Sequence, residues 1–290
     1  MEFLQPSDWQ DALAAKAAFP DAVPVRGGTD VMVEMNFDRG RPAALLDLSH
    51  VKELGEWGRD DTDDTCVRIG AGVTYTRVLR ELGTTVPGLA QAARTVGSPQ
   101  IRNRGTIGGN LGAASPAGDC HPVLLAADAV YEVESAARGV RRIGADEFYL
   151  GPKRNSLDAD ELIRAIVVRA TDTGQQFAKI GTRNAMVIAA CSFAVAINRE
   201  VRSVRTGIGS AGPTPLRAPE AETYLTDMMT QGELWEGGRL PDADVLKRFG
   251  DLVAGAARPI DDVRATAAYR RHSLRVMARR TATWALRQSC

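Results

Sequence analysis

Two segments rich in glycine and hydroxyl residues carry the chemistry of this chain. The long glycine segment, residues 97–119, combines bare glycines with Thr106, Asn110, Ser115 and Asp119. Glycine lets a backbone approach a ligand closely and turn its N–H groups toward an anion. The polar side chains add hydrogen bonds, and the carboxylate suits hydroxyl groups. Such a lining fits a phosphate joined to a sugar, although a plain surface loop is the other interpretation of this segment alone.

The short glycine segment, Gly27-Gly28-Thr29-Asp30, follows Val23-Pro24-Val25-Arg26, which predicts a buried strand. A strand, a Gly-Gly turn and a hydroxyl residue form a second cradle of N–H donors of phosphate size. Two cradles far apart in the sequence suit a dinucleotide, because its pyrophosphate and two sugars need an extended cleft.

The surrounding residues predict an α+β fold that positions both segments. A capping box of Ser7 and Gln10 predicts the first helix. Further strands are expected over 44–48, 66–73, 129–135, 161–168, 176–180 and 201–208. Further helices are expected over 74–82, 87–95, 122–127, 219–229, 243–257 and from 262 onward. Residues 31–35 fit a helix or an extended continuation, and the apolar run 186–197 fits a strand or a buried helix.

Changes in sequence character predict the domain organisation. A small α/β unit extends to about residue 55, and the chain changes character near 171–174. We therefore expect a domain over 1–172, with lobes of about 1–55 and 56–172, and a second domain over 173–290. In the last helix, Leu274, Met277, Thr281 and Trp284 share one side and predict a core face.

Composition excludes several classes of function. The chain of 290 residues has 36 basic and 36 acidic side chains, which favours neither nucleic acid nor an anionic membrane as partner. No run approaches the roughly 18 apolar residues of a membrane span, and no secretion signal is visible, so a cytoplasmic protein is expected. The cysteines and histidines are scattered, at positions 66, 120, 191 and 290 and at 50, 121 and 272. The sequence therefore predicts no metal ligand and no catalytic acid, base or nucleophile in this chain.

The stretch Gly207–Gly212 matches the G-x-G-x-x-G fingerprint of dinucleotide-binding folds, but prolines follow it at 213, 215 and 219. That fingerprint requires a helix to begin within it. Because the prolines oppose a regular helix there, a tight turn after a strand is the better prediction.

Three features of the sequence each allow two interpretations. His121 fits a buried structural histidine or, less well, a flavin attachment point. Lys179 and Arg183 fit a cofactor cleft or the surface. The arginine-rich last helix fits a solvated face or a docking face for an acidic partner subunit.

Several motifs together resemble a known family. They are Gly27-Gly28-Thr29-Asp30, Arg104-Gly105-Thr106-Ile107-Gly108-Gly109-Asn110, Ala114-Ser115-Pro116-Ala117-Gly118-Asp119 with Pro122, and the segment 259–272. In this order they resemble the FAD-binding medium subunit of the molybdenum hydroxylases, a family that includes xanthine dehydrogenase and carbon monoxide dehydrogenase. The resemblance is greatest to the FAD subunits of bacterial xanthine dehydrogenases.

The resemblance implies a two-lobed FAD-binding fold of the vanillyl-alcohol-oxidase (PCMH) type, followed by a smaller α+β flavoprotein C-terminal domain. It places the pyrophosphate on residues 25–31 and 105–110, the sugar or ribityl chain on Ser115 and Asp119, and the ring system near Lys179. The full implied set is Val25, Arg26, Gly27, Gly28, Thr29, Asp30, Val31, Gly97, Gly105, Thr106, Ile107, Gly108, Gly109, Asn110, Ser115, Asp119, Leu162, Ile163 and Lys179. Arg26 departs from the small residue that is common before these glycines.

The resemblance also implies partners. The [2Fe–2S] clusters and the molybdopterin belong to a small and a large partner subunit, and this chain passes electrons through FAD to NAD+ or another acceptor. Two alternatives stay open: a self-sufficient FAD-dependent oxidoreductase of the same fold, and the FAD subunit of a carbon monoxide or aromatic N-heterocycle dehydrogenase.

Overall fold

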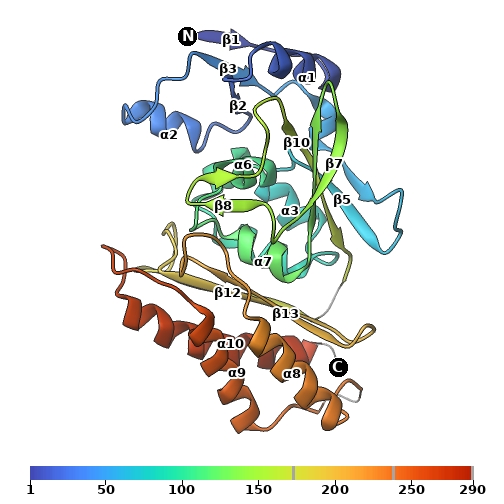
Figure 1. Ribbon diagram of the computed structural model, residues 1–290, viewed down its shortest axis with the longest axis vertical. Coiled ribbons are helices and arrows are strands. Elements are labelled where there is room, and N and C mark those ends of the chain that lie inside the picture. The colour runs from blue at the N-terminus through green and yellow to red at the C-terminus, as the bar shows by residue number, and fades with distance from the viewer. Residues whose placement is uncertain (172–173, 237–238, 289–290) are drawn as a thin grey trace.

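A computed structural model describes residues 1–171, 174–236 and 239–288. Three tiers follow one another along the long axis of the molecule (Figure 1). A small parallel sheet with its helices lies at one end, a five-stranded antiparallel sheet with short helices lies in the middle, and a three-stranded sheet backed by three helices lies at the other end.

The N-terminal tier is a parallel sheet in the order β1 (Glu2–Leu4), β3 (Ala44–Asp47), β2 (Val23–Val25). Helix α1 (Trp9–Ala18) packs on it through buried Trp9, Ala12 and Leu13. The predicted Ser7 cap is wrong by one residue. The Asp8 carboxylate caps the helix by accepting the Asp11 N–H at 2.9 Å, while the Ser7 hydroxyl donates to the Asp11 side chain. A carboxylate is the better partner for the positive end of the helix dipole.

The middle tier is a sheet in the order β4 (Trp57–Arg59), β5 (Cys66–Gly70), β10 (Leu162–Arg169), β6 (Val130–Ser135), β7 (Gly139–Gly144). The strands β5, β6 and β10 confirm the predicted ones, whereas the edge strands β4 and β7 were not predicted. Strand β7 lacks apolar alternation, and ion pairs attach it to its neighbours instead. Arg142 contacts Glu132 at 2.9 Å, and Arg141 contacts Glu161 at 2.7 Å. A two-stranded hairpin of β8 (Tyr149–Gly151) and β9 (Arg154–Asn155) follows β7.

Short helices cover this sheet. The predictions for α3 (Tyr75–Glu81), α4 (Pro87–Thr95) and the buried α7 (Cys120–Ala126) are confirmed, and a one-turn 3-10 helix spans Lys52–Gly55. The long glycine segment is more ordered than a loop: it forms α5 (Pro99–Arg104) and α6 (Ile107–Ala113). Side-chain caps and the burial of apolar residues between the glycines outweigh the low helix propensity of glycine. After the short glycine segment, the chain continues as a helix, α2 (Val31–Asn36).

The C-terminal tier is an antiparallel sheet of β11 (Gln175–Ile180), β12 (Cys191–Asn198) and β13 (Ser203–Gly209). Three helices, α8 (Pro219–Gln231), α9 (Ala243–Ala256) and α10 (Ala267–Gln288), back it. The ambiguous apolar run resolves as a strand from Cys191 onward. The G-x-G-x-x-G stretch ends β13 and turns, and the next helix begins only at Pro219, as predicted. A Cβ at Gly207 would overlap the carbonyl of Pro122, so this glycine serves the packing of α7 on β13.

The structure has two hydrophobic clusters. The first is formed mainly by residues of the N-terminal and middle tiers, and the second lies between the C-terminal sheet and its helices. On α10, Leu274, Met277 and Thr281 are buried as expected, but Trp284 is 44% exposed. Its assignment to the core is wrong because the helical period brings Ala285, not Trp284, to the buried face. The predicted domain boundary at 172–173 lies outside the described residues and stays a prediction.

Candidate cofactor site

Both glycine segments line one cavity of about 580 Å³ between the N-terminal and middle tiers. The β2–α2 turn supplies residues 25–31, and α6 supplies Thr106, Gly108, Gly109 and Asn110. Ser115, Leu162 and Ile163 complete the predicted residues in the wall. The fold thus brings together segments about 80 positions apart, as a dinucleotide requires.

The short glycine segment offers free hydrogen-bond donors. Within the described part of the chain, the backbone N–H groups of Gly27, Gly28, Thr29 and Asp30 donate no hydrogen bond. Gly28 has a φ of +71°, a conformation that favours glycine. Successive free N–H groups around such a turn form a cradle for an anion.

The long segment is different, because its N–H groups are used inside the protein. Those of Ile107 and Gly108 donate to the carbonyls of Val73 and Ala71 at 3.1 and 2.8 Å, and that of Gly109 donates to the Thr106 hydroxyl at 3.0 Å. Helix α6 lines the cavity with Gly108, Gly109, Asn110, Gly112 and Ala113. The Asn110 Oδ1 atom is buried and has no hydrogen-bond partner among the described residues.

Close backbone contacts fix the cavity walls. A Cβ at Gly27 would overlap the carbonyl oxygen of Arg104, and one at Gly108 would overlap Ala71. Gly27 therefore lets the N-terminal tier approach the end of α5, and Gly108 lets α6 approach the end of β5. Any larger residue would push the walls apart.

Part of the wall was not predicted. Tyr75, Ile101, Asn155 at the end of β9 and four residues after that strand also line the cavity; these four are Leu157, Asp158, Ala159 and Glu161. Apart from Ile101, which lies within the long glycine segment, none of these residues stands in a glycine motif or carries a recognisable spacing. Only the folded sheet brings them to the cavity.

Five residues of the predicted set lie outside the cavity lining: Gly97, Gly105, Ile107, Asp119 and Lys179. Asp119 forms a buried ion pair with Lys179, whose Nζ lies 2.5 Å from its Oδ2, and also accepts the Thr95 hydroxyl at 2.9 Å. Burial raises the pKa of Asp119, and Lys179 opposes that shift. Because Lys179 belongs to β11, this pair links the middle tier to the C-terminal tier.

His121 contacts the backbone of the long glycine segment. Its ring is fully buried, lies 4.8 Å from the Tyr149 ring, and its Nε2 lies 3.0 Å from the carbonyl of Asn110. Burial lowers its pKa to about 4, while the carbonyls of Asn110 and Ser115 act in the opposite direction. A neutral imidazole that does not line the cavity favours the structural interpretation.

The arrangement fits a flavin dinucleotide. Free N–H groups of the short segment suit a pyrophosphate, and the orphaned Asn110 acceptor suits a sugar hydroxyl. Among the described residues, no group of three or more His, Cys, Asp or Glu side chains could hold a metal ion. No helix described here is long and apolar enough to cross a membrane.

Comparison with known proteins decides the family. Residues 1–169 match the FAD binding domain in molybdopterin dehydrogenase, and residues 176–285 match the CO dehydrogenase flavoprotein C-terminal domain. The chain belongs to the FAD-binding subunits of the molybdenum hydroxylases. The predicted family and fold are confirmed.

The chain is similar to proteins that are named for several different dehydrogenases. The nicotinate dehydrogenase FAD-subunit of Eubacterium barkeri is 32% identical, with 77% of this chain and 79% of that protein aligned. The xanthine dehydrogenase FAD-binding subunit of Escherichia coli O157:H7 is also 32% identical, over 73% of this chain and 74% of that protein. A carbon monoxide dehydrogenase chain from Hydrogenophaga pseudoflava superimposes with a TM-score of 0.85 at 25% identity, covering 98% of this chain and 96% of that one.

Proposed function

We propose that this FAD subunit relays electrons from the [2Fe–2S] clusters of a small partner subunit, by way of FAD, to NAD+ or another acceptor. A large partner subunit carries the molybdopterin and oxidises the substrate. The observation that carries the proposal is the single cavity lined by both glycine segments, one of which has four unused N–H groups. When bound, FAD supplies the redox chemistry, and the chain itself supplies position and environment.

Each part of the cavity has a distinct task in this proposal. The N–H groups of residues 27–30 hold the pyrophosphate, and Asn110 accepts a hydroxyl of the sugar or ribityl chain. Leu162 and Ile163, both buried on β10, give the adenine an apolar wall. The ion pair of Asp119 and Lys179 is outside the cavity lining and joins the middle tier to the C-terminal tier.

The substrate belongs to the partner chain, and we propose an N-heteroaromatic compound of the xanthine type. The nicotinate dehydrogenase FAD-subunit, caffeine dehydrogenase subunit beta and the xanthine dehydrogenase FAD-binding subunit are each 32% or 33% identical to this chain. The medium chain of carbon monoxide dehydrogenase is 27% identical. We also propose that the complex works in the cytoplasm.

The test is purification of the full chain with and without its partner subunits. We expect one FAD per chain, visible as flavin absorbance, and reduction of that flavin by excess NADH in the reverse direction. A chain without flavin would overturn the cofactor assignment. Reduction by dithionite but not by NADH would instead show that the acceptor is not NAD+.

The alternative of a self-sufficient flavin oxidoreductase requires an acid or base beside the cofactor. His121, the histidine within two residues of the long glycine segment, is fully buried and does not line the cavity. Turnover by the isolated chain on a small substrate would favour this alternative, and activity only in the presence of partner subunits would exclude it.

A further inference from the structure

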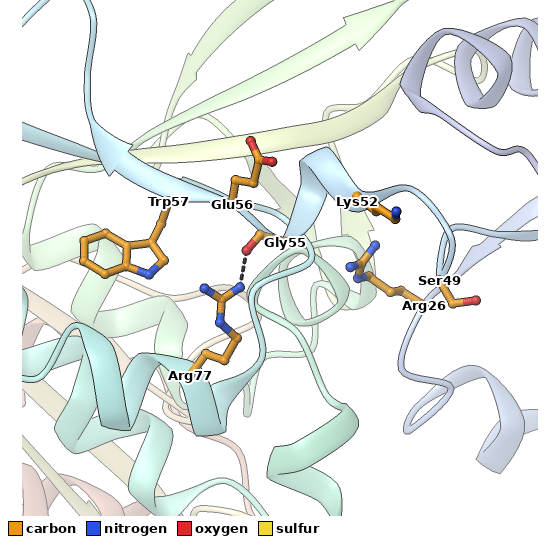
Figure 2. Close-up of a pocket in the computed structure, with 7 residues that line it drawn as sticks. All are labelled: Arg26, Ser49, Lys52, Gly55, Glu56, Trp57 and Arg77. Atoms are coloured by element: carbon orange, nitrogen blue, oxygen red, sulfur yellow. Dashed lines mark hydrogen bonds between the residues drawn. The ribbon is translucent and has the colours of Figure 1, made fainter.

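A second pocket lies next to the dinucleotide cavity, on the far side of Arg26. It has an open volume of about 600 Å³ and is lined by Arg26, Ser49, Lys52, Gly55, Glu56, Trp57 and Arg77. Figure 2 shows Arg26 and Lys52 on one side of Gly55 and Arg77 with Trp57 on the other. We propose that this pocket, which shares Arg26 with the dinucleotide cavity, binds a small phosphate-bearing anion in addition to the FAD proposed for that cavity.

Arg26 is the centre of the argument. Its Nη1 donates to the carbonyls of Leu48 and Val51 at 2.6 and 2.9 Å, and its side chain lies against the bare backbone of Gly72. These contacts hold the guanidinium in place but leave Nε and Nη2 without a hydrogen-bond partner in the described chain. That free edge is the one that binds an oxyanion with two parallel hydrogen bonds.

The positive charge of Arg26 also has no carboxylate partner among the described residues. No described carboxylate lies within ion-pair distance of it, and the half-buried position lowers its pKa, with Asp47 acting in the opposite direction. A half-buried cation without a counter-ion gains stability when an anion binds beside it.

On the opposite side of the pocket, Arg77 and Trp57 are held in place by hydrogen bonds to Glu81. The Arg77 guanidinium binds the Glu81 carboxylate with two hydrogen bonds of 2.8 and 2.7 Å and donates to the carbonyl of Gly55. The Trp57 indole N–H donates to the same carboxylate at 2.6 Å, and the ring is 36% exposed. Arg77 is thus neutralised, and Trp57 offers a flat apolar face beside it.

Lys52 supplies the second free cation. It is exposed on the one-turn helix and makes no ion pair or hydrogen bond with the described residues. Glu56 is the one acidic side chain among the residues that line the pocket, so two free cations face one carboxylate. The surplus of positive charge favours an anion, and the size of the pocket leaves room for a phosphate with a group attached.

The experiment uses the full chain loaded with FAD, so that the dinucleotide cavity is filled. Inorganic phosphate and ADP are titrated separately by calorimetry at constant ionic strength, with chloride as the balancing anion. We expect saturable binding of phosphate. Tighter binding of ADP than of phosphate would assign the site to a nucleotide, and equal binding would assign it to free phosphate; either result supports the proposal.

Three variants make the assignment specific. Lys52→Met and Arg26→Met should each weaken phosphate binding at least tenfold, whereas Glu56→Gln should strengthen it severalfold because a like charge is removed. Lys247→Met, an exposed lysine on α9, is the matched control and should bind as the wild type does. The FAD content of each variant is measured by absorbance, so a failure of this pocket is distinguishable from a loss of the cofactor.

Two results would overturn the proposal. One is a heat of phosphate binding no larger than that of chloride. The other is equal binding by Lys52→Met, Glu56→Gln and wild type. Because Lys52 and Glu56 are exposed, neither substitution threatens the fold.

Discussion

The two glycine segments look alike in sequence but use their backbones differently. In residues 27–30 the N–H groups are free, whereas in residues 107–109 they donate to Val73, Ala71 and Thr106. We propose that the first segment binds the ligand, whereas in the second the missing side chain of Gly108 lets α6 lie against the end of β5. Gly28, with its positive φ, shapes the turn of the first segment, whereas Gly27 and Gly108 each permit close approach of two backbones.

Adjacent glycines on α6 provide the sharpest test of this difference. Gly108→Val would drive its side chain into Ala71, so we expect a loss of about 3 kcal/mol in the free energy of unfolding. Denaturant unfolding measures this loss. Gly40→Val is the control, because nothing lies within 4 Å of a Cβ there. Equal stability of the two variants would contradict the packing role.

His121 should give the next largest effect, seen as pH dependence. Its pKa is about 4 in the folded chain and about 6.5 when unfolded, so the unfolded state binds more protons between these values. Stability is therefore lost as the pH falls through this window. Between pH 7 and 5 the wild type should lose about 2 kcal/mol more than His121→Gln. Parallel pH profiles of unfolding would show that the imidazole is not buried as a neutral group.

Gly109 should behave unlike its neighbour. It is exposed toward the cavity, and a Cβ there would lie 3.0 Å from the Thr106 hydroxyl. We expect Gly109→Val to lose FAD while unfolding within about 1 kcal/mol of the wild type, the cost of a weakened helix cap. Absorbance at the flavin band measures occupancy, and full occupancy in this variant would remove α6 from the binding site.

Asn110 should give the smallest effect. Its Oδ1 lacks a protein partner, so Asn110→Ala should leave stability unchanged and weaken FAD binding by about 1 kcal/mol, or roughly fivefold. Fluorescence titration with FAD measures the change. An unaltered dissociation constant would show that this buried acceptor does not contact the cofactor.

Sequence reasoning identified the glycine segments because their composition is local and unusual. It also located the longer strands and helices, where apolar periodicity or a Thr74 cap marks the element. It missed β7, which is held by Arg141 and Arg142 and not by apolar residues. It also missed the cavity wall at 155–161, since only long-range pairing of the sheet brings that segment beside residues 27–30. The ion pair of Lys179 with Asp119 likewise depends on how two domains meet.

Amide hydrogen exchange, with and without FAD, tests the central claim most directly. The account predicts that the amides of residues 27–30 exchange rapidly in the FAD-free chain and slowly once FAD is bound. The amides of residues 107–109, already bonded within the protein, should exchange slowly in both states. Protection that appears at residues 107–109 instead, with none at 27–30, would contradict it.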